Sequence, residues 1–182
     1  MTGTEADPDQ AWVDAARHGN EAAMERLYRR HAGAIHAYAL RATARRDAAD
    51  DVTQETFIRA FRGLTRFDGR SSFRTWLFAI GVNCTRTRLK RLERAGEAVG
   101  LDAVELAIEP EAPVGWTRQR LQAALHSLPS GYREAVIMHD VLEMEHEEIA
   151  TARGCSVGTS KSQLHKARAK LRALLGPLKG LG

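Results

Sequence analysis

The sequence predicts an all-α protein of two small helical domains joined by a flexible acidic linker, with a helix-turn-helix in the C-terminal domain. Over most of the chain, apolar residues recur at spacings of three and four, which is the period of an amphipathic helix. No segment shows the period of two that β-branched residues follow in a half-buried strand. An acidic stretch rich in proline and glycine interrupts the helical pattern, so the helices fall into two groups.

The first group of helices is expected within residues 1–92. Its first long helix covers 21–42, where apolar side chains share one face. The next helix is expected over 49–64, with Asp47 as its N-cap and Asp50 as an acid at its third position. Each helix therefore has both an apolar face to bury and a recognisable beginning.

A loop rich in glycine, aspartate and serine, residues 66–71, ends this second helix. Ser72 is placed to cap a third helix, whose apolar side includes Phe73 and Trp76. We expect Trp76 to serve packing, because an aromatic residue at helical spacing commonly does. Phe67 lies in the loop, where burial in a core is a weaker expectation.

The acidic stretch 93–116 is typical of a linker between domains, because its prolines and glycines interrupt any helix. A turn of helix around 104–108 is the regular structure we expect within it. Helical patterning resumes at Trp116 and stops at Pro129, so the second domain is expected over 117–182.

Residues 147–161 carry the pattern of a helix-turn-helix. Gly154 can adopt the left-handed conformation that closes a tight turn after a short helix. Ala150 is small where two helices must cross closely, and Ser156 can cap the second helix. In this motif the second helix enters the major groove of DNA.

The second helix of the motif is basic and contains no acid. Its cationic or titratable residues are Lys161, His165, Lys166, Arg168, Lys170 and Arg172. A basic run alone commonly forms a solvated helix face, but directly after the turn signature it favours DNA binding. Two residues depart from the usual pattern: Arg153 is expected to lay its stem across the turn, and Ser160 to leave the small core underfilled.

Composition excludes several classes of protein. The formal net charge of +4 is a weak indication of a polyanionic partner. The N-terminus lacks the basic start and apolar core of a signal peptide, and the longest apolar run, 76–82, is too short to cross a bilayer. Cys84 and Cys155 form no CxxC pair and are expected to behave as small apolar residues. We therefore expect a cytoplasmic protein with no membrane insertion.

The sequence contains no complete motif of the enzyme classes considered. The segment 146–150 begins like a zinc-protease helix, but Ala150 occupies the second ligand position. The acids at the start of the helix over 49–64 are ordinary compensation of the helix dipole. The sequence has no glycine-rich phosphate loop. We expect no catalytic residue, no metal site and no cofactor.

Motifs in both halves resemble the extracytoplasmic-function (ECF, group 4) sigma factors of the sigma-70 family. Residues 128–136, 147–150 and 157–168 are similar to the promoter-binding C-terminal domain of that family. Residues 50–61 resemble its polymerase-binding helix, and 66–77 its promoter-melting loop and helix. The resemblance covers nearly the whole chain apart from the linker and the extreme ends.

The resemblance implies a sigma factor, which directs RNA polymerase to promoters and is controlled by an anti-sigma factor. Residues 1–92 would be region 2, which binds core polymerase and recognises and melts the minus-ten element. Residues 117–182 would be region 4, which recognises the minus-thirty-five element. The implied partners are core RNA polymerase, through its beta-prime coiled coil and beta flap, promoter DNA and an anti-sigma factor.

The resemblance also implies site residues. Those facing the beta-prime coiled coil would be Asp51, Gln54 and Glu55. Those at the minus-ten element would be Phe67, Asn83, Arg74, Arg86, Arg88, Lys90 and Arg91. Among them, Phe67 and Asn83 would line a pocket for a flipped base, because an aromatic ring stacks on a base and an amide reads its edge. Those at the minus-thirty-five element would be Lys161, Ser162, Gln163, His165, Lys166 and Arg168.

Departures from the family pattern bear on which promoter is read. Gln163 stands where the family typically has an Arg, and a glutamine there would favour adenine whereas an arginine favours guanine. Thr87 stands where an Asp is common. The main alternative is a transcription regulator of another kind, with a helix-turn-helix output and an N-terminal sensing or dimerising module. That alternative leaves the motifs over 50–61 and 66–77 without a role.

Overall fold

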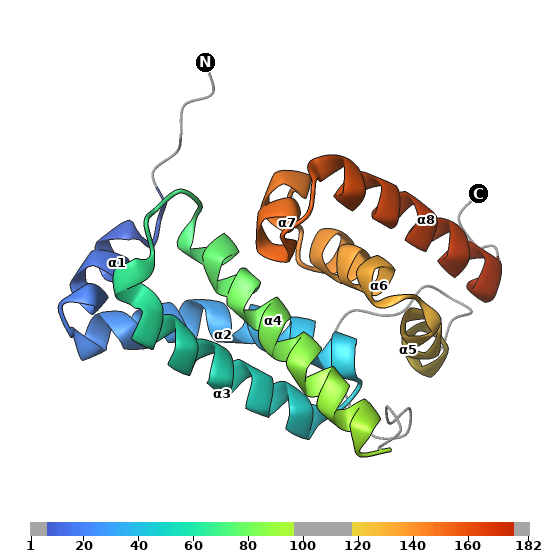
Figure 1. Cartoon of the computed structure of the whole chain (residues 1–182), viewed down its shortest axis with the longest axis horizontal. Helices are drawn as coiled ribbons and strands as arrows, with labels where there is room; N and C mark the ends of the chain where they lie inside the picture. The colour runs from blue at the N-terminus through green and yellow to red at the C-terminus, as the bar shows by residue number, and fades with distance from the viewer. Residues whose placement is uncertain (1–6, 97–117, 177–182) are drawn as a thin grey trace.

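The computed structural model describes residues 7–96 and 118–176, and its regular elements in these ranges are all helical (Figure 1). The first domain contains α1 (Gln10–Arg17), α2 (Glu21–Thr43), α3 (Arg46–Gly63), the short η1 (Leu64–Arg66) and α4 (Phe73–Arg94). The second contains α5 (Arg118–Ser127), α6 (Ser130–Val136), the π-helical turn η2 (Ile137–Val141), α7 (His146–Arg153) and α8 (Val157–Leu175). The all-α, two-domain prediction is confirmed.

Most of the predicted local signals are found in the structure. Ser72 caps α4, because its Oγ accepts a hydrogen bond from the backbone N–H of Thr75 at 3.1 Å. Ser156 caps α8 in the same way, and Gly154 has the expected left-handed conformation with φ of 66°. The predicted N-cap of α3 is wrong: the helix begins at Arg46, so Asp47 lies in its first turn.

The first domain packs α1 to α4 around large buried side chains. They are Val13, Leu27, Ile35, Tyr38, Phe57, Phe73 and Phe78. A Cβ built on Gly81 of α4 would approach Cδ1 of Ile35 to 3.3 Å, so glycine permits the close crossing of α4 and α2. Burial of this many aromatic and branched side chains is the main stabilising contribution to the domain.

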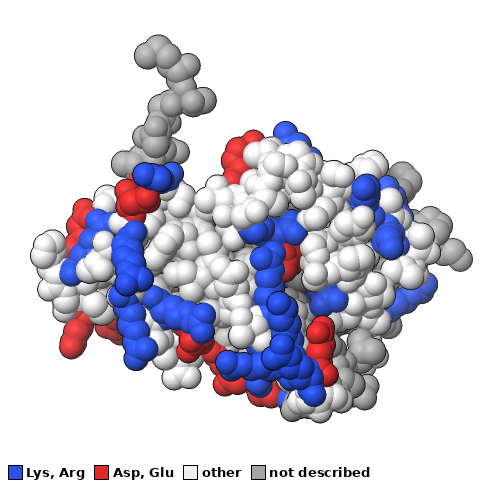
Figure 2. All heavy atoms as spheres, in the orientation of Figure 1, with Lys and Arg blue, Asp and Glu red and all other residues white. Residues whose placement is uncertain are grey.

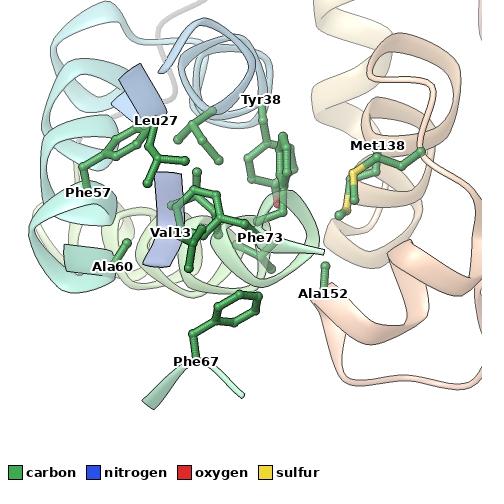
Figure 3. Packing of buried hydrophobic residues seen from close by; sticks show 14 of the residues in the cluster. Val13, Leu27, Tyr38, Phe57, Ala60, Phe67, Phe73, Met138 and Ala152 are labelled. Carbon is green, nitrogen blue, oxygen red and sulfur yellow. The ribbon is translucent and has the colours of Figure 1, made fainter. Parts of the chain in front are cut away.

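The second domain has a small core of its own and also shares the core of the first. Its own cluster includes Leu128, Val136 and Leu164. Met138 and Ala152, by contrast, belong to the same buried cluster as the first-domain residues, and Figure 3 shows them facing that cluster. The two domains are therefore packed together, with α7 against α4, which sequence analysis did not predict.

The predicted linker falls mostly outside the described residues. Helix α4 ends at Arg94, two residues inside the stretch predicted as the linker, and the helical turn expected at 104–108 lies outside the described residues. In the parts of the chain that are described, no helix has the length and apolar character needed to cross a bilayer.

Candidate functional site

A groove between α3 and α4 collects the residues predicted to bind polymerase. Asp51, Gln54 and Glu55 lie on the exposed face of α3, and all three line this groove of about 420 Å³. Arg88 and Arg91 line it from α4. Residues that the sequence analysis assigned to polymerase and to DNA therefore meet in one place, called here the α3–α4 groove.

Several charged side chains of the α3–α4 groove form ion pairs with one another or with neighbouring residues. A guanidinium nitrogen of Arg88 lies 3.2 Å from a carboxylate oxygen of Asp51 and 3.8 Å from one of Asp47. Nε of Arg59 donates to Oε1 of Glu55 at 2.6 Å, one helical turn away. These pairs are largely exposed, so each contributes about 0–1 kcal/mol and yields readily to another partner.

The first domain buries Phe67 instead of presenting it. Only 3% of Phe67 is exposed, and its ring packs against Phe73 and Trp76. The guanidinium of Arg17 lies over the same ring and donates to the carbonyl oxygen of Phe67. Phe67 is thus part of the core, although burial was the weaker expectation for a loop residue, and the packing role expected for Trp76 is confirmed.

Asn83 is exposed in the middle of α4. It lies seven residues beyond Trp76, which corresponds to about 10 Å along the helix axis. Because Phe67 packs at the Trp76 end, this conformation does not bring Phe67 and Asn83 into one base-binding pocket. Their DNA-binding roles stay predictions.

Lys and Arg side chains form a band over α4 in Figure 2. Two of the predicted DNA-binding residues in this helix contact the second domain. Nη2 of Arg74 donates to the carbonyl oxygen of Leu142 at 2.7 Å, and Nη1 lies 3.7 Å from Oε1 of Glu148. Both nitrogens of the Arg86 fork donate to the carboxylate of Glu134, at 2.9 and 2.7 Å. Lys90 and Arg91 are exposed.

Glu134 is shared between the two domains. Its side chain is 7% exposed and also accepts a hydrogen bond of 2.9 Å from Nε of Arg153, which is 4% exposed. The prediction that Arg153 lays its stem across the turn is therefore wrong: a carboxylate on α6 holds its guanidinium inside the protein. The hydrogen bonds from Arg86 to Glu134 raise the pKa of that guanidinium, so the pair stays charged. We call Arg86, Glu134 and Arg153 the Glu134 cluster.

Further polar contacts join the domains around this cluster. Nη1 of Arg133 donates to the carbonyl oxygen of Ala42, and Nε2 of Gln122 donates to that of Arg41. The hydroxyl of Tyr38 is buried nearby and has no hydrogen-bond partner among the described residues. Burial, reinforced by the negative charge of Glu134, raises the pKa of Tyr38 far above its usual value, so the ring stays neutral.

The exposed face of α8 carries most of the residues predicted to read the minus-thirty-five element. Lys161, Ser162, His165 and Lys166 are all exposed. Gln163 is only half-buried and lies against Gly131 of α6, where its Oε1 has no partner within the described chain. Its placement does not favour base reading, and its role stays a prediction.

The two remaining positions of interest on α8 have specific partners. Ser160 is fully buried, and its Oγ lies 2.9 Å from Nδ1 of His146 on α7. The prediction of an underfilled core at Ser160 is wrong, because the hydroxyl replaces apolar packing with a hydrogen bond. Arg168 donates from Nε and Nη2 to the two carboxylate oxygens of Asp140 in η2.

Metal binding and cysteine chemistry find no support in the described residues. Within them, no group of three or more His, Cys, Asp or Glu side chains could hold a metal ion. Cys84 is buried, which raises the pKa of its thiol and opposes reactivity, while Cys155 is half-buried.

Each half of the chain matches a family model. Residues 27–95 match the family model described as Sigma-70 region 2, and residues 118–171 match the one described as Sigma-70, region 4. The ECF RNA polymerase sigma factor EcfG of Rhodopseudomonas palustris is 36% identical over 142 residues, 78% of each chain. This chain is an ECF sigma factor of the sigma-70 family. As such it directs promoter-specific initiation of transcription and is not a catalyst by itself.

Solved structures of related sigma factors share the fold. The structure of CnrH in complex with the cytosolic domain of CnrY superposes with a TM-score of 0.68 at 32% identity, covering 92% of this chain and 96% of CnrH. RpoE of Bartonella quintana, in complex with the anti-sigma factor NepR, also gives 0.68, at 28% identity, covering 83% of this chain and 95% of RpoE.

Proposed function

We propose that this sigma factor acts in the cytoplasm, where it binds core RNA polymerase through the α3–α4 groove and promoter DNA through α4 and α8. Residues 1–92 are proposed as region 2, residues 93–116 as the linker, and residues 117–182 as region 4. The observation that supports this most is that Asp51, Gln54 and Glu55 line one groove while the exposed face of α8 carries cations.

The groove suits a basic, helical surface such as the beta-prime coiled coil of polymerase. Its carboxylates are exposed and pair with Arg88, which is half-buried, and Arg59, which is exposed, so a basic partner exchanges one weak ion pair for another. Gln54 is exposed and adds an amide that can both donate and accept hydrogen bonds. The beta flap is proposed to contact the second domain.

Promoter contacts are divided between two helices. Lys90 and Arg91 on α4, and Lys161 and Lys166 on α8, are exposed and suit phosphate neutralisation. Asn83 is proposed to bind a flipped base of the minus-ten element. The side chain of Phe67 would have to leave its packing against Trp76 to join it.

The packed arrangement of the domains is proposed to be a closed form that cannot use a promoter. The guanidinium of Arg86 binds Glu134, and that of Arg74 binds Glu148 and the carbonyl oxygen of Leu142. In the proposed open form, DNA phosphates would take the place of these partners. Promoter binding therefore requires the second domain to leave α4. Because Arg153 also pairs with Glu134, the carboxylate keeps a partner when Arg86 departs.

An anti-sigma factor is the proposed regulator of this opening. RpoE of Bartonella quintana was solved in complex with the anti-sigma factor NepR, and CnrH in complex with the cytosolic domain of CnrY. A protein that bridges the two domains would stabilise the closed form, since any ligand that binds one state selectively shifts the population toward it.

In vitro transcription tests this proposal against that of a conventional repressor or activator. The chain is mixed with core RNA polymerase and a promoter library, and transcripts are sequenced. A sigma factor gives transcripts that begin at defined sites and binds duplex DNA weakly without polymerase. A conventional regulator binds duplex DNA alone and yields no transcripts with core enzyme, and that result would refute the proposal.

A further inference from the structure

The inner side of α8 is attached to the rest of the second domain by polar side chains, in addition to its apolar core. Ser160 lies in the first turn of the helix and is fully buried, with its Oγ 2.9 Å from Nδ1 of His146. A buried hydroxyl that is hydrogen-bonded fixes both the distance and the rotation of its helix, because the bond is directional and costly to leave unmade.

The partner of Ser160 is itself held by a second histidine. The rings of His146 and His139 lie with centroids 4.7 Å apart and planes inclined by 34°. Nδ1 of His139 lies 3.0 Å from Oδ1 of Asp140, the next residue in η2. Ser160 is thus connected through two imidazole rings to the carboxylate of Asp140.

The same carboxylate holds α8 a second time, two turns further on. Both oxygens of Asp140 accept hydrogen bonds from the fork of Arg168, with the Nε bond at 3.1 Å. Partial burial opposes the charged form of Asp140, but the hydrogen bonds from Arg168 and His139 outweigh it and hold the pKa below its usual range. The carboxylate is therefore ionised and paired at neutral pH.

We propose that Ser160, His146, His139, Asp140 and Arg168 form a clamp that sets the rotation of α8, and so determines how Lys161, Ser162 and Lys166 meet the bases and phosphates of promoter DNA. We call these five residues the α8 clamp. In this proposal Arg168 is a positioning residue and not a phosphate contact. The inference rests on the proposed function of α8 as the helix that reads the minus-thirty-five element.

Two points on α8, about eight residues or 12 Å apart along its axis, are enough to fix its orientation. Ser160 holds the N-terminal part of the helix, next to Lys161 and Ser162, and Arg168 holds the helix about two turns further on. The buried apolar residues between these two points, Leu164 and Ala167, fill the space but are small or flexible. A specific rotation therefore depends on the directional bonds at the two ends.

Neutralising Asp140 distinguishes two roles for Arg168, that of a positioning residue in the clamp and that of a direct phosphate contact. If Arg168 contacts a DNA phosphate, Asp140→Asn would release Arg168 from its ion pair and remove a negative charge near the DNA. The chain would then bind promoter DNA more tightly. If Arg168 positions α8, the same substitution loosens the helix. Discrimination between the preferred minus-thirty-five sequence and its single-base variants then falls by about three- to tenfold, the range expected for one lost hydrogen-bonded contact.

The experiment uses the full chain with core RNA polymerase and templates randomised over the minus-thirty-five element, with sequencing of transcripts. Asp140→Asn is compared with Glu143→Gln, which removes the same charge from an exposed neighbouring position. The clamp predicts lost discrimination only in Asp140→Asn. Unchanged discrimination with stronger binding would overturn the clamp alone, whereas a wild-type chain that yields no transcripts would overturn the proposed function as well.

The histidines supply a second readout that a merely structural role would not change. Desolvation, the neighbouring His139 and Lys161 together lower the pKa of His146, while Glu147 on the same helix and Glu145 at its N-cap oppose that shift. Because its pKa is lowered, the His146 ring becomes protonated only below pH 6.5, and its positive charge then lies close to Lys161 and loosens the clamp. Discrimination by the wild-type chain should therefore be weaker at a pH well below 6.5 than at pH 7.5.

His146→Asn keeps a hydrogen-bonding amide near the position of Nδ1 but does not titrate. It should retain most of the discrimination at pH 7.5 and lose the pH dependence, whereas Ser160→Ala should lose discrimination at both pH values. Salt dependence should stay unchanged in Ser160→Ala, because no phosphate contact is removed. Equal pH profiles for the wild-type chain and His146→Asn would overturn the clamp. Helical content measured by circular dichroism confirms that each variant is folded.

Discussion

Removal of one charge from the Glu134 cluster should open the two domains. The substitution Arg86→Gln removes both hydrogen bonds to Glu134 from α4, and it leaves Glu134 paired with Arg153 within the second domain. No buried carboxylate is left without a partner, so neither domain should unfold. The substitution therefore acts on the contact between the domains more than on their stability.

The geometry of the pair sets the expected magnitude. Two charge-assisted hydrogen bonds to a carboxylate that is 7% exposed would contribute about 1.5–3 kcal/mol. The arginine side chain is 39% exposed, so solvent weakens the pair, and we take about 1–2 kcal/mol. That free energy changes the ratio of closed to open molecules by about five- to thirtyfold.

Small-angle X-ray scattering measures this opening as an increase in the radius of gyration of the free chain. Glu134→Gln should have the same effect, with an added loss of thermal stability because Arg153 then lacks its buried partner. Glu143→Gln, which removes an exposed acid, serves as the control. If both cluster variants stay as compact as the control, the pair between Arg86 and Glu134 does not hold the domains together and the closed form needs another explanation.

Three further predictions concern the proposed DNA contacts and the partly buried His126. Lys161→Ala combined with Lys166→Ala should weaken promoter use and reduce the salt dependence of binding by about one unit for each lost phosphate contact; an unchanged slope would show that neither side chain touches DNA. Asn83→Ala should impair promoter opening more than initial docking, so permanganate footprints that match the wild type would refute the base-pocket role. Desolvation and the nearby Arg133 lower the pKa of His126 to about 4, so the native state favours the neutral ring and loses stability as pH falls from about 6.5 toward 4. The loss is on the order of 1–3 kcal/mol, and thermal unfolding of His126→Gln should lack this part of the pH dependence.

The sequence predicted the features that depend on local patterns. The helical periods, the cap at Ser72, the turn at Gly154 and the cap at Ser156 are all present, because each depends on a few adjacent residues. The grouping of Asp51, Gln54 and Glu55 in one groove also follows from helical spacing on α3. Regular local chemistry was sufficient for these inferences.

The contacts that were missed are all long-range. Arg153 pairs with a glutamate on another helix, and the packing of the two domains depends on apolar residues such as Met138 that a helical pattern assigns only to some core. One signal was available in the sequence: an arginine at a position expected to be apolar requires an acid, and Glu134 stands at the start of the apolar run 135–138. Burial of Phe67 was only weakly expected, because a loop position does not reveal the aromatic rings that surround it in space.

Binding to core RNA polymerase is the most direct test of the proposed function, because every proposed promoter contact forms only when the chain is bound to that enzyme. The purified chain is titrated into fluorescently labelled core polymerase, alongside a variant in which Asp51, Gln54 and Glu55 are replaced by alanine. We predict saturable binding of one chain per core enzyme, with binding weakened at least about tenfold in the variant. A chain that binds promoter duplex but shows no affinity for core polymerase would contradict the account.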